Sequence, residues 1–155
     1  MDILEASSEH LDALVPLFDS YRVFYRRPSD PAGARRFLAD RIARRESVIY
    51  LAFVEGEPAG FVQLYPSFSS ASMQRLWILN DLYVASDARR RGVAGALLDR
   101  ARRLAEETGA KGLTLSTGVD NTPAQRLYES LGWMRDRDFY VYTLRVGQVN
   151  NLRAD

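Results

Sequence analysis

The order of apolar and polar residues in the first third of the 155-residue chain predicts one strand followed by two helices. A short apolar stretch at Asp2–Ala6 predicts the strand. Apolar residues three and four positions apart after Ser8 then predict a helix that Ser8 caps. The prolines of Arg26–Pro31 end this helix, because proline disfavours helical geometry in the residue before it. We expect the second helix at Ala32–Arg44.

Three β-rich runs occupy the middle of the chain. Val48–Val54 is almost wholly apolar, which is typical of a strand buried on both faces. The composition of Glu55–Pro58 predicts a turn, so Ala59–Tyr65 would return beside the first run as an antiparallel hairpin. After the Ser-rich link Ser67–Ser72, a further strand is expected at Leu76–Val84.

The clearest helix is predicted over Gly92–Thr108, where apolar residues fall on one side and charged residues on the other. Gly109 stands where a left-handed C-terminal cap belongs. A strand is expected next, at Gly112–Thr117.

The final third continues with a second capped helix. Thr122-Pro123-Ala124-Gln125 has the form of a capping box with proline at the first helical position, and Gly132 would end the helix. Trp133–Val146 is expected to form one or two strands. The resulting order, β-α-α-β-β-β-α-β-α-β, predicts a mixed α+β fold around one sheet. Residues 1–146 would form one domain and residues 147–155 a short tail.

The composition of the chain argues against several classes of function. The net charge of +1 gives no reason to expect nucleic-acid binding, and no apolar run approaches the roughly 18 residues of a membrane helix. The acidic N-terminus does not resemble a signal peptide. Without cysteine there is no disulfide or thiolate nucleophile, which permits the cytoplasmic location that we expect. His10, the single histidine, is expected to be a surface or capping residue, so neither a catalytic triad nor a metal site is predicted.

The most informative segment is Leu82–Leu98, where a strand leads into a basic loop that opens a helix. The first N–H groups of a helix lack internal partners and carry the positive end of its dipole. Gly92, Ala94 and Gly95 would let a phosphate approach these groups, and Arg89–Arg91 add positive charge. This pattern predicts a site for phosphate or pyrophosphate. The alternative is a structural loop with solvated arginines. The segment matches neither the triphosphate loop nor the dinucleotide fingerprint.

Two motifs resemble the GCN5-related N-acetyltransferase (GNAT) family. Arg89-x-x-Gly92-x-Ala94 matches the Gln/Arg-x-x-Gly-x-Gly/Ala signature, and Asp81-Leu82-Tyr83-Val84 before it looks like the family's fourth strand. Asn121-x-x-Ala124-x-x-x-Tyr128-x-x-x-Gly132-Trp133 is similar to its second motif, with Trp where Phe is commonest. Tyr21–Asp30 and Leu79-Asn80-Asp81 further resemble the histone- and polyamine-acetyltransferase-like branch.

The resemblance implies a mostly antiparallel sheet flanked by about four helices, and acetyl-coenzyme A as donor. The loop would hold the pyrophosphate through backbone amides, the strand would pair with the pantetheine arm, and Asn121 would lie beside the donor. The donor-binding residues implied are Leu82, Tyr83, Val84, Arg89, Arg90, Arg91, Gly92, Val93, Ala94, Gly95, Asn121, Ala124 and Tyr128.

Two residues are candidates for proton transfer. Tyr128 matches the family position that often protonates the departing thiolate, although its helix face also suits a core residue. Asp81 is the candidate base, through water, or alternatively a polar residue at a strand bend. Asn121 is equally well explained as a turn residue before a Thr122 cap. Without cysteine, direct attack by the amine in a ternary complex is favoured over an enzyme thioester.

The resemblance places the acceptor between the first two helices and the strand after the hairpin. Aromatic residues with a carboxylate suit a cationic amine, although each aromatic residue could equally belong to the core. The candidates are Tyr21, Phe24, Tyr25, Tyr65 and Phe68, with Asp19, Asp30 and Asp81 as charges. We expect acetylation of a primary amine of a small molecule or peptide. The alternatives are a non-catalytic acyl-coenzyme A sensor and a basic-loop nucleic-acid binder. The apolar Phe139–Val146 predicts an edge strand of a homodimer.

Overall fold

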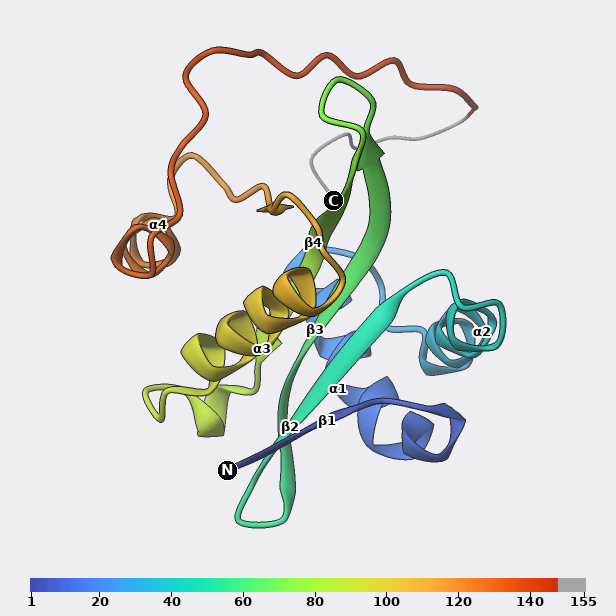
Figure 1. Ribbon diagram of the computed structural model, residues 1–155. Helices are drawn as coiled ribbons and strands as arrows, with labels where there is room; N and C mark the ends of the chain where they lie inside the picture. The colour runs from blue at the N-terminus through green and yellow to red at the C-terminus, as the bar shows by residue number, and fades with distance from the viewer. Residues whose placement is uncertain (148–155) are drawn as a thin grey trace.

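The predicted apolar runs form a single five-stranded sheet in the order β1-β2-β3-β4-β5 (Figure 1). The computed structural model describes residues 1–147. The strands are β1 (Asp2–Glu5), β2 (Val48–Val54), β3 (Glu57–Ser69), β4 (Gln74–Val84) and β5 (Leu113–Thr114). The first four pair antiparallel, and β5 pairs parallel with β4. The mixed α+β fold and the mostly antiparallel sheet are therefore confirmed.

Helices cover both faces of this sheet, with α1 and α2 on one face and α3 on the other (Figure 1). They are α1 (Leu11–Phe24), α2 (Pro31–Ala43), α3 (Val93–Glu107) and α4 (Thr122–Ser130), with short 3-10 turns η1 (Ser8–His10) and η2 (Ser86–Ala88). The predicted apolar side of α3 is buried, with Leu97 and Ala101 at 0% exposure. Its hydrophobic spacing thus determines which side packs on the sheet.

Two helix caps differ from the prediction by one residue. Ser7 rather than Ser8 precedes the first turn, and its N–H donates to His10 Nδ1 at 2.9 Å, which confirms His10 as a capping residue. Asn121 rather than Thr122 caps α4, because its side-chain oxygen accepts from the Ala124 N–H at 3.3 Å. In both places a neighbouring polar residue satisfies the free N–H groups of the helix start.

A β-bulge interrupts β4 at Asn80. Gln63 of β3 pairs with Asp81, and the next residue, Leu64, pairs with Leu79, so Asn80 has no partner in β3. One extra residue reverses the alternation of side chains along the strand. Leu79 and Leu82 therefore both pack on the α3 side, whereas Asp81 lines a cavity on the α1 side.

β4 and β5 pair over only two residues before they diverge. β5 covers two residues rather than the predicted Gly112–Thr117, and it pairs with β4 only at Trp77 and Ile78. Within residues 1–147, β4 from Asn80 to Val84 has no strand beside it on this edge. The backbone donors and acceptors of this stretch therefore have no strand partner on that edge.

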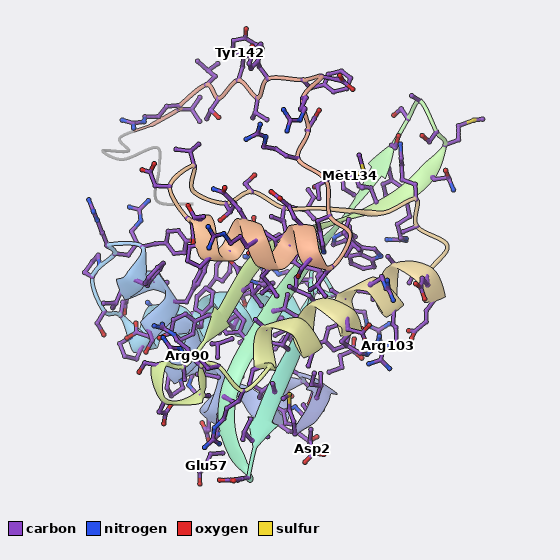
Figure 2. All side chains as sticks on the ribbon, turned by 90° about the vertical axis from the view of Figure 1, so that its left-hand side faces the viewer. Asp2, Glu57, Arg90, Arg103, Met134 and Tyr142 are labelled. Atoms are coloured by element: carbon purple, nitrogen blue, oxygen red, sulfur yellow. The ribbon has the colours of Figure 1, made fainter. Side chains whose placement is uncertain are left out.

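The predicted strands at Trp133–Val146 do not form. Within residues 133–147 there is no helix or strand, and apolar side chains such as Tyr140 and Tyr142 are about nine-tenths exposed, at 91% and 92%. Figure 2 shows Tyr142 standing clear of the sheet and helices. A strand needs backbone partners, and no described strand of this chain lies beside the segment. Apart from Gly147, the predicted tail at 147–155 lies outside the described residues.

No helix within residues 1–147 combines the length and the apolar character that crossing a membrane requires.

Candidate active site

A cavity of about 360 Å³ opens between β4 and the first two helices, and we name it the aromatic cavity. Its lining residues are Phe18, Tyr21, Arg22, Tyr25, Arg27, Asp30, Gly33, Ala34, Phe37, Tyr65, Asn80 and Asp81. Five predicted acceptor residues lie here, namely Tyr21, Tyr25, Asp30, Tyr65 and Asp81. The aromatic rings come from α1, α2 and β3, so the fold brings distant segments to one site.

Ring contacts make the walls of the aromatic cavity. Phe18 stacks on Phe37 with ring centroids 5.9 Å apart, and Tyr21 meets Phe61 edge-on at 5.8 Å. Burial raises the pKa of Tyr65 to about 12, and the nearby charge of Asp81 acts in the same direction. The same two causes raise the pKa of Tyr25. Both phenols are therefore neutral hydrogen-bonding groups at physiological pH.

Asp81 places a carboxylate in this otherwise aromatic setting, and only 5% of the residue is exposed. Its Oδ2 accepts from Gln63 Nε2 at 2.6 Å, and its Oδ1 accepts from Asn80 Nδ2 at 3.0 Å. Hydrogen bonds of this kind favour the ionised form of an acid and offset the cost of burial. The strand bend that the sequence suggested as an alternative role is the bulge itself, and Asp81 faces the cavity beside it.

A second hollow, of about 260 Å³, lies where β4 and β5 separate, and we name it the β4–β5 cleft. Its lining residues are Tyr21, Phe24, Tyr25, Leu79, Asn80, Leu82, Tyr83, Val84, Arg89, Ala94, Leu115, Ser116, Thr117, Asn121, Ala124, Leu127 and Tyr128. Most residues predicted to contact the donor on β4 and α4 therefore lie together. The fold brings them there because β5 leaves the edge of β4 open.

The start of α3 borders this cleft. Gly92 caps the helix in the left-handed region at φ 77°, and the first helical bond runs from the Ala96 N–H to the Gly92 carbonyl at 3.1 Å. The amides of Val93, Ala94 and Gly95 thus precede the first helical bond, and no side chain caps them. Val93 is buried in the core, with the whole residue only 2% exposed, and it does not line the cleft.

The three arginines of the loop are not equivalent. Arg89 lines the cleft, and its Nε donates to the Val84 carbonyl at 3.2 Å. Arg91 lies 4.0 Å from Glu55 in the β2–β3 turn, and both side chains are largely exposed. Arg90 has a positive φ of 64° and is exposed. Arg89 is therefore the loop arginine that lines the cleft, and Arg90 and Arg91 do not line it.

Tyr128 lies on α4, where it packs against the core and also lines the cleft. Its ring packs against Trp133 with centroids 6.1 Å apart, and the same residue lines the cleft. Burial raises the pKa of Tyr128, and the nearby phenol of Tyr25 adds to this effect. The phenol therefore keeps its proton at physiological pH. Asn121 likewise combines its capping role with a place in the cleft wall.

The aromatic cavity and the β4–β5 cleft share Tyr21, Tyr25 and Asn80 in their walls. The Tyr21 hydroxyl donates to the Asn80 carbonyl at 3.5 Å, so the shared wall is formed by α1 and the bulge of β4. A molecule in one hollow can thus meet a molecule in the other at the bulge.

Three predicted acceptor residues lie elsewhere. Phe24 is 62% exposed and lines the β4–β5 cleft, and Phe68 is 70% exposed and lines neither hollow. Phe68 instead packs under the guanidinium of Arg75 at 5.1 Å. Asp19 accepts from Ser29 Oγ at 2.6 Å and from the Asp30 N–H at 2.8 Å, and these bonds lower its pKa. Asp19 therefore holds the loop between α1 and α2 rather than lining the cavity.

Sequence reasoning missed Gln63 and did not use Asn80. Gln63 is a polar residue inside an apolar strand, a signal that could have marked it. Asn80 disfavours a regular strand, which was a signal for the bulge. The contributions of Phe18 and Phe37 to the cavity have no such signal, because their spacing is that of ordinary core positions.

The chain belongs to the acetyltransferase (GNAT) family, whose sequence profile it matches over residues 14–133, and it is an acetyltransferase. It is 48% identical over 146 residues to an uncharacterized N-acetyltransferase of Bacillus subtilis (strain 168), YhfO, covering 94% of this chain and 98% of the relative. It is 32% identical to a probable acetyltransferase of Haemophilus influenzae, covering 83% and 97%. A crystal structure of a probable acetyltransferase superimposes with a TM-score of 0.91 at 52% identity, covering 96% and 99%.

Proposed function

We propose that this acetyltransferase moves the acetyl group of acetyl-coenzyme A directly to a primary amine of a small molecule or peptide. The observation that supports this proposal is the meeting of the two hollows at Asn80, Tyr21 and Tyr25. One hollow offers backbone and small residues to an elongated anionic donor. The other offers an acid and aromatic rings to a cation. A direct transfer requires both reactants to be bound next to one another.

The β4–β5 cleft suits the donor for two independent reasons. The open edge of β4 from Leu82 to Val84 can pair with the amide groups of the pantetheine arm, as an added strand would. The N–H groups at the start of α3 can donate hydrogen bonds to the pyrophosphate, with Arg89 adding a full positive charge. Gly92, Ala94 and Gly95 present little side chain at this place, so the phosphate could approach closely.

The aromatic cavity suits a cationic amine. Asp81 supplies a negative charge, and the rings of Tyr21, Tyr25 and Tyr65 offer faces to which an ammonium group is attracted. Asp30 adds a second carboxylate to the lining. We infer that the acceptor enters as an ammonium ion and must lose a proton before it can attack.

Asp81 and Tyr128 divide the proton transfers. Asp81, directly or through water, takes a proton from the ammonium group, and the neutral nitrogen bonds to the acetyl carbonyl carbon. The carbon–sulfur bond then breaks, and Tyr128 gives its phenolic proton to the sulfur. The second proton of the attacking nitrogen leaves with the collapse and restores Tyr128, while Asp81 releases its own proton to solvent. The products are the N-acetylated amine, free coenzyme A and one proton.

We also propose that the protein is a homodimer in which the segment at 139–146 covers its apolar side chains against a second copy. Leu144 and Val146 are 88% and 79% exposed in the single chain, and Tyr140 and Tyr142 are also exposed. A run of exposed apolar side chains of this kind is typical of an interaction surface.

Free-thiol release from acetyl-coenzyme A measures the proposed reaction. The acceptor panel contains polyamines, amino acids, aminoglycosides, arylamines and basic peptides, with acetyl-coenzyme A alone as the blank. Release above the blank with one class of primary amine, together with the N-acetyl product by mass spectrometry, supports the proposal. Donor binding without release for any amine contradicts a primary-amine acceptor. Absence of donor binding contradicts the assignment of the β4–β5 cleft.

A further inference from the structure

Gln63 is a buried polar side chain that the proposed proton transfers do not use. It lies on β3, directly opposite Asp81 in the antiparallel register, and it is fully buried at 0% exposure. Gln63 and Asp81 are the buried polar side chains among residues 1–147. A polar side chain in such a position is costly unless its hydrogen bonds are satisfied.

The carboxamide of Gln63 bridges two partners from different strands. Its Nε2 donates to Asp81 Oδ2 at 2.6 Å, and its Oε1 accepts from Ser47 Oγ at 2.8 Å. Ser47 directly precedes β2 and is itself partly buried. The hydrogen bonds from Ser47 through Gln63 to Asp81 thus link the residue before β2 to β3 and β4.

This arrangement allows one orientation of the amide. An ionised carboxylate only accepts hydrogen bonds, so the NH₂ group must face Asp81. The carbonyl end then faces Ser47, whose hydroxyl donates to it. The reversed amide would bring its oxygen against the carboxylate, and two acceptors would repel each other. The carboxylate therefore sets the direction of the amide, and Ser47, whose hydroxyl donates to the carbonyl end, holds the amide in place.

We propose that Gln63 is a positioning residue for the acetyl transfer: held by Ser47, it keeps Asp81 ionised and aimed into the aromatic cavity. This inference rests on the proposed function of Asp81 as the base. Without Gln63, one carboxylate oxygen would lose a short charge-assisted bond inside a buried site. A proton would then compete for that oxygen, and the side chain would be free to turn.

Other charged and titratable groups face the same cavity as Asp81 and remain in place when Gln63 is changed. They are Tyr21, Arg22, Tyr25, Arg27, Asp30 and Tyr65. Because these groups are the same in the wild type and in both Gln63 variants below, they cannot account for a difference between them.

The first test is the substitution Gln63→Leu, which puts an apolar side chain of similar size in place of the amide. We expect kcat to fall about tenfold to a hundredfold and the acid limb of the pH profile to move up by about one pH unit, because the ionised carboxylate loses a donor. Acetyl-coenzyme A binding, measured by calorimetry, stays unchanged because the β4–β5 cleft is not touched. Gln63→Glu moves the limb further, since two adjacent carboxylates cannot both ionise. Ser47→Ala moves it in the same direction by less.

Ile49→Val is the matched control. Ile49 pairs with Gln63 in the neighbouring strand and is 1% exposed. Its truncation lowers the unfolding temperature without changing the acid limb, and this separates a loss of packing from a loss of positioning. On an Asp81→Asn background, adding Gln63→Leu lowers kcat by no more than about twofold, because no carboxylate is left to position.

An NMR titration of the Asp81 carboxyl carbon provides a readout that needs no turnover. In the wild-type protein this carbon titrates at lower pH than in Gln63→Leu if the inference is correct. Equal titration midpoints, or a pH profile of Gln63→Leu that superimposes on that of the wild type, overturn the role of Gln63. Absence of thiol release by the wild type contradicts the proposed function instead, and the titration still decides whether Gln63 holds Asp81 ionised.

Discussion

The aromatic cavity and the β4–β5 cleft lie on either side of one strand, yet they are built from different parts of the chain. The cavity is built from side chains, namely aromatic rings and the buried carboxylate of Asp81. The cleft adds backbone groups to its side chains, at the edge of β4 that no strand covers and at the start of α3. A backbone site tolerates substitution as long as the residues stay small, whereas a side-chain site changes its ligand with each substitution. The donor is therefore expected to be held constant while the acceptor varies.

The largest effect is expected from Gly92→Glu, which changes the start of α3 and should weaken donor binding. Gly92 has φ 77°, and glutamate there adds both backbone strain and a negative charge at the phosphate position. We expect the Kd for acetyl-coenzyme A, measured by calorimetry, to rise about a hundredfold or more, equal to at least about 2.7 kcal/mol. Gly109→Glu is the control, because Gly109 has φ 67° at the other end of α3 and lies outside the cleft. Equal donor affinity in Gly92→Glu and wild type would remove this loop from the donor site.

An intermediate effect is expected from Tyr128→Phe, which keeps the ring packed on Trp133 and removes only the hydroxyl. We expect kcat to fall about tenfold to a thousandfold with donor affinity nearly unchanged, as for a lost general acid. Since burial raises the pKa of Tyr128, the acid form is present below its ordinary value of 10.0 and is lost only above it. The wild-type rate should therefore not decline from this group between about pH 7 and 9. Full activity of Tyr128→Phe would leave Tyr128 a core residue only.

The smallest effect on the reaction is expected from Tyr142→Asp, because residue 142 lines neither the aromatic cavity nor the β4–β5 cleft. Sedimentation should show the wild type as a dimer at micromolar concentration and Tyr142→Asp as a monomer, because a buried unpaired charge opposes the proposed contact. The rate of thiol release per chain should change by less than about twofold, since residue 142 lines neither hollow. A wild type that sediments only as a monomer contradicts the homodimer.

The helices and the first strands were predictable from the sequence where the apolar residues of an element fall on one face. In α3, each predicted apolar position from Val93 to Ala105 is buried, and Gly109 has the expected positive φ. Trp133–Val146 has an equally apolar pattern and forms no strand. The pattern of apolar residues shows how well a segment could pack. A strand also needs a second strand to pair with, and whether one lies beside it depends on the rest of the fold.

The site was predictable where the chemistry depends on local sequence. The motif around Arg89 and Gly92 correctly marks a helix start beside an open strand edge. Phe68 could have been excluded on the same ground, because it lies three residues beyond Tyr65 on β3, and the alternation of side chains along a strand places the two on opposite faces. Gln63 was missed since its partner, Asp81, is 18 positions away along the chain.

The bulge at Asn80 also bears on how the two hollows are held together. Deleting that one residue would place Asp81 directly between Leu79 and Leu82, which both pack on the α3 side, so regular alternation would keep the carboxylate on the α1 side. The deletion would instead remove the amide that donates to Asp81 Oδ1 and the carbonyl that the Tyr21 hydroxyl meets. The extra residue is thus not what turns the acid toward its cavity; it is what joins the two hollows in one wall.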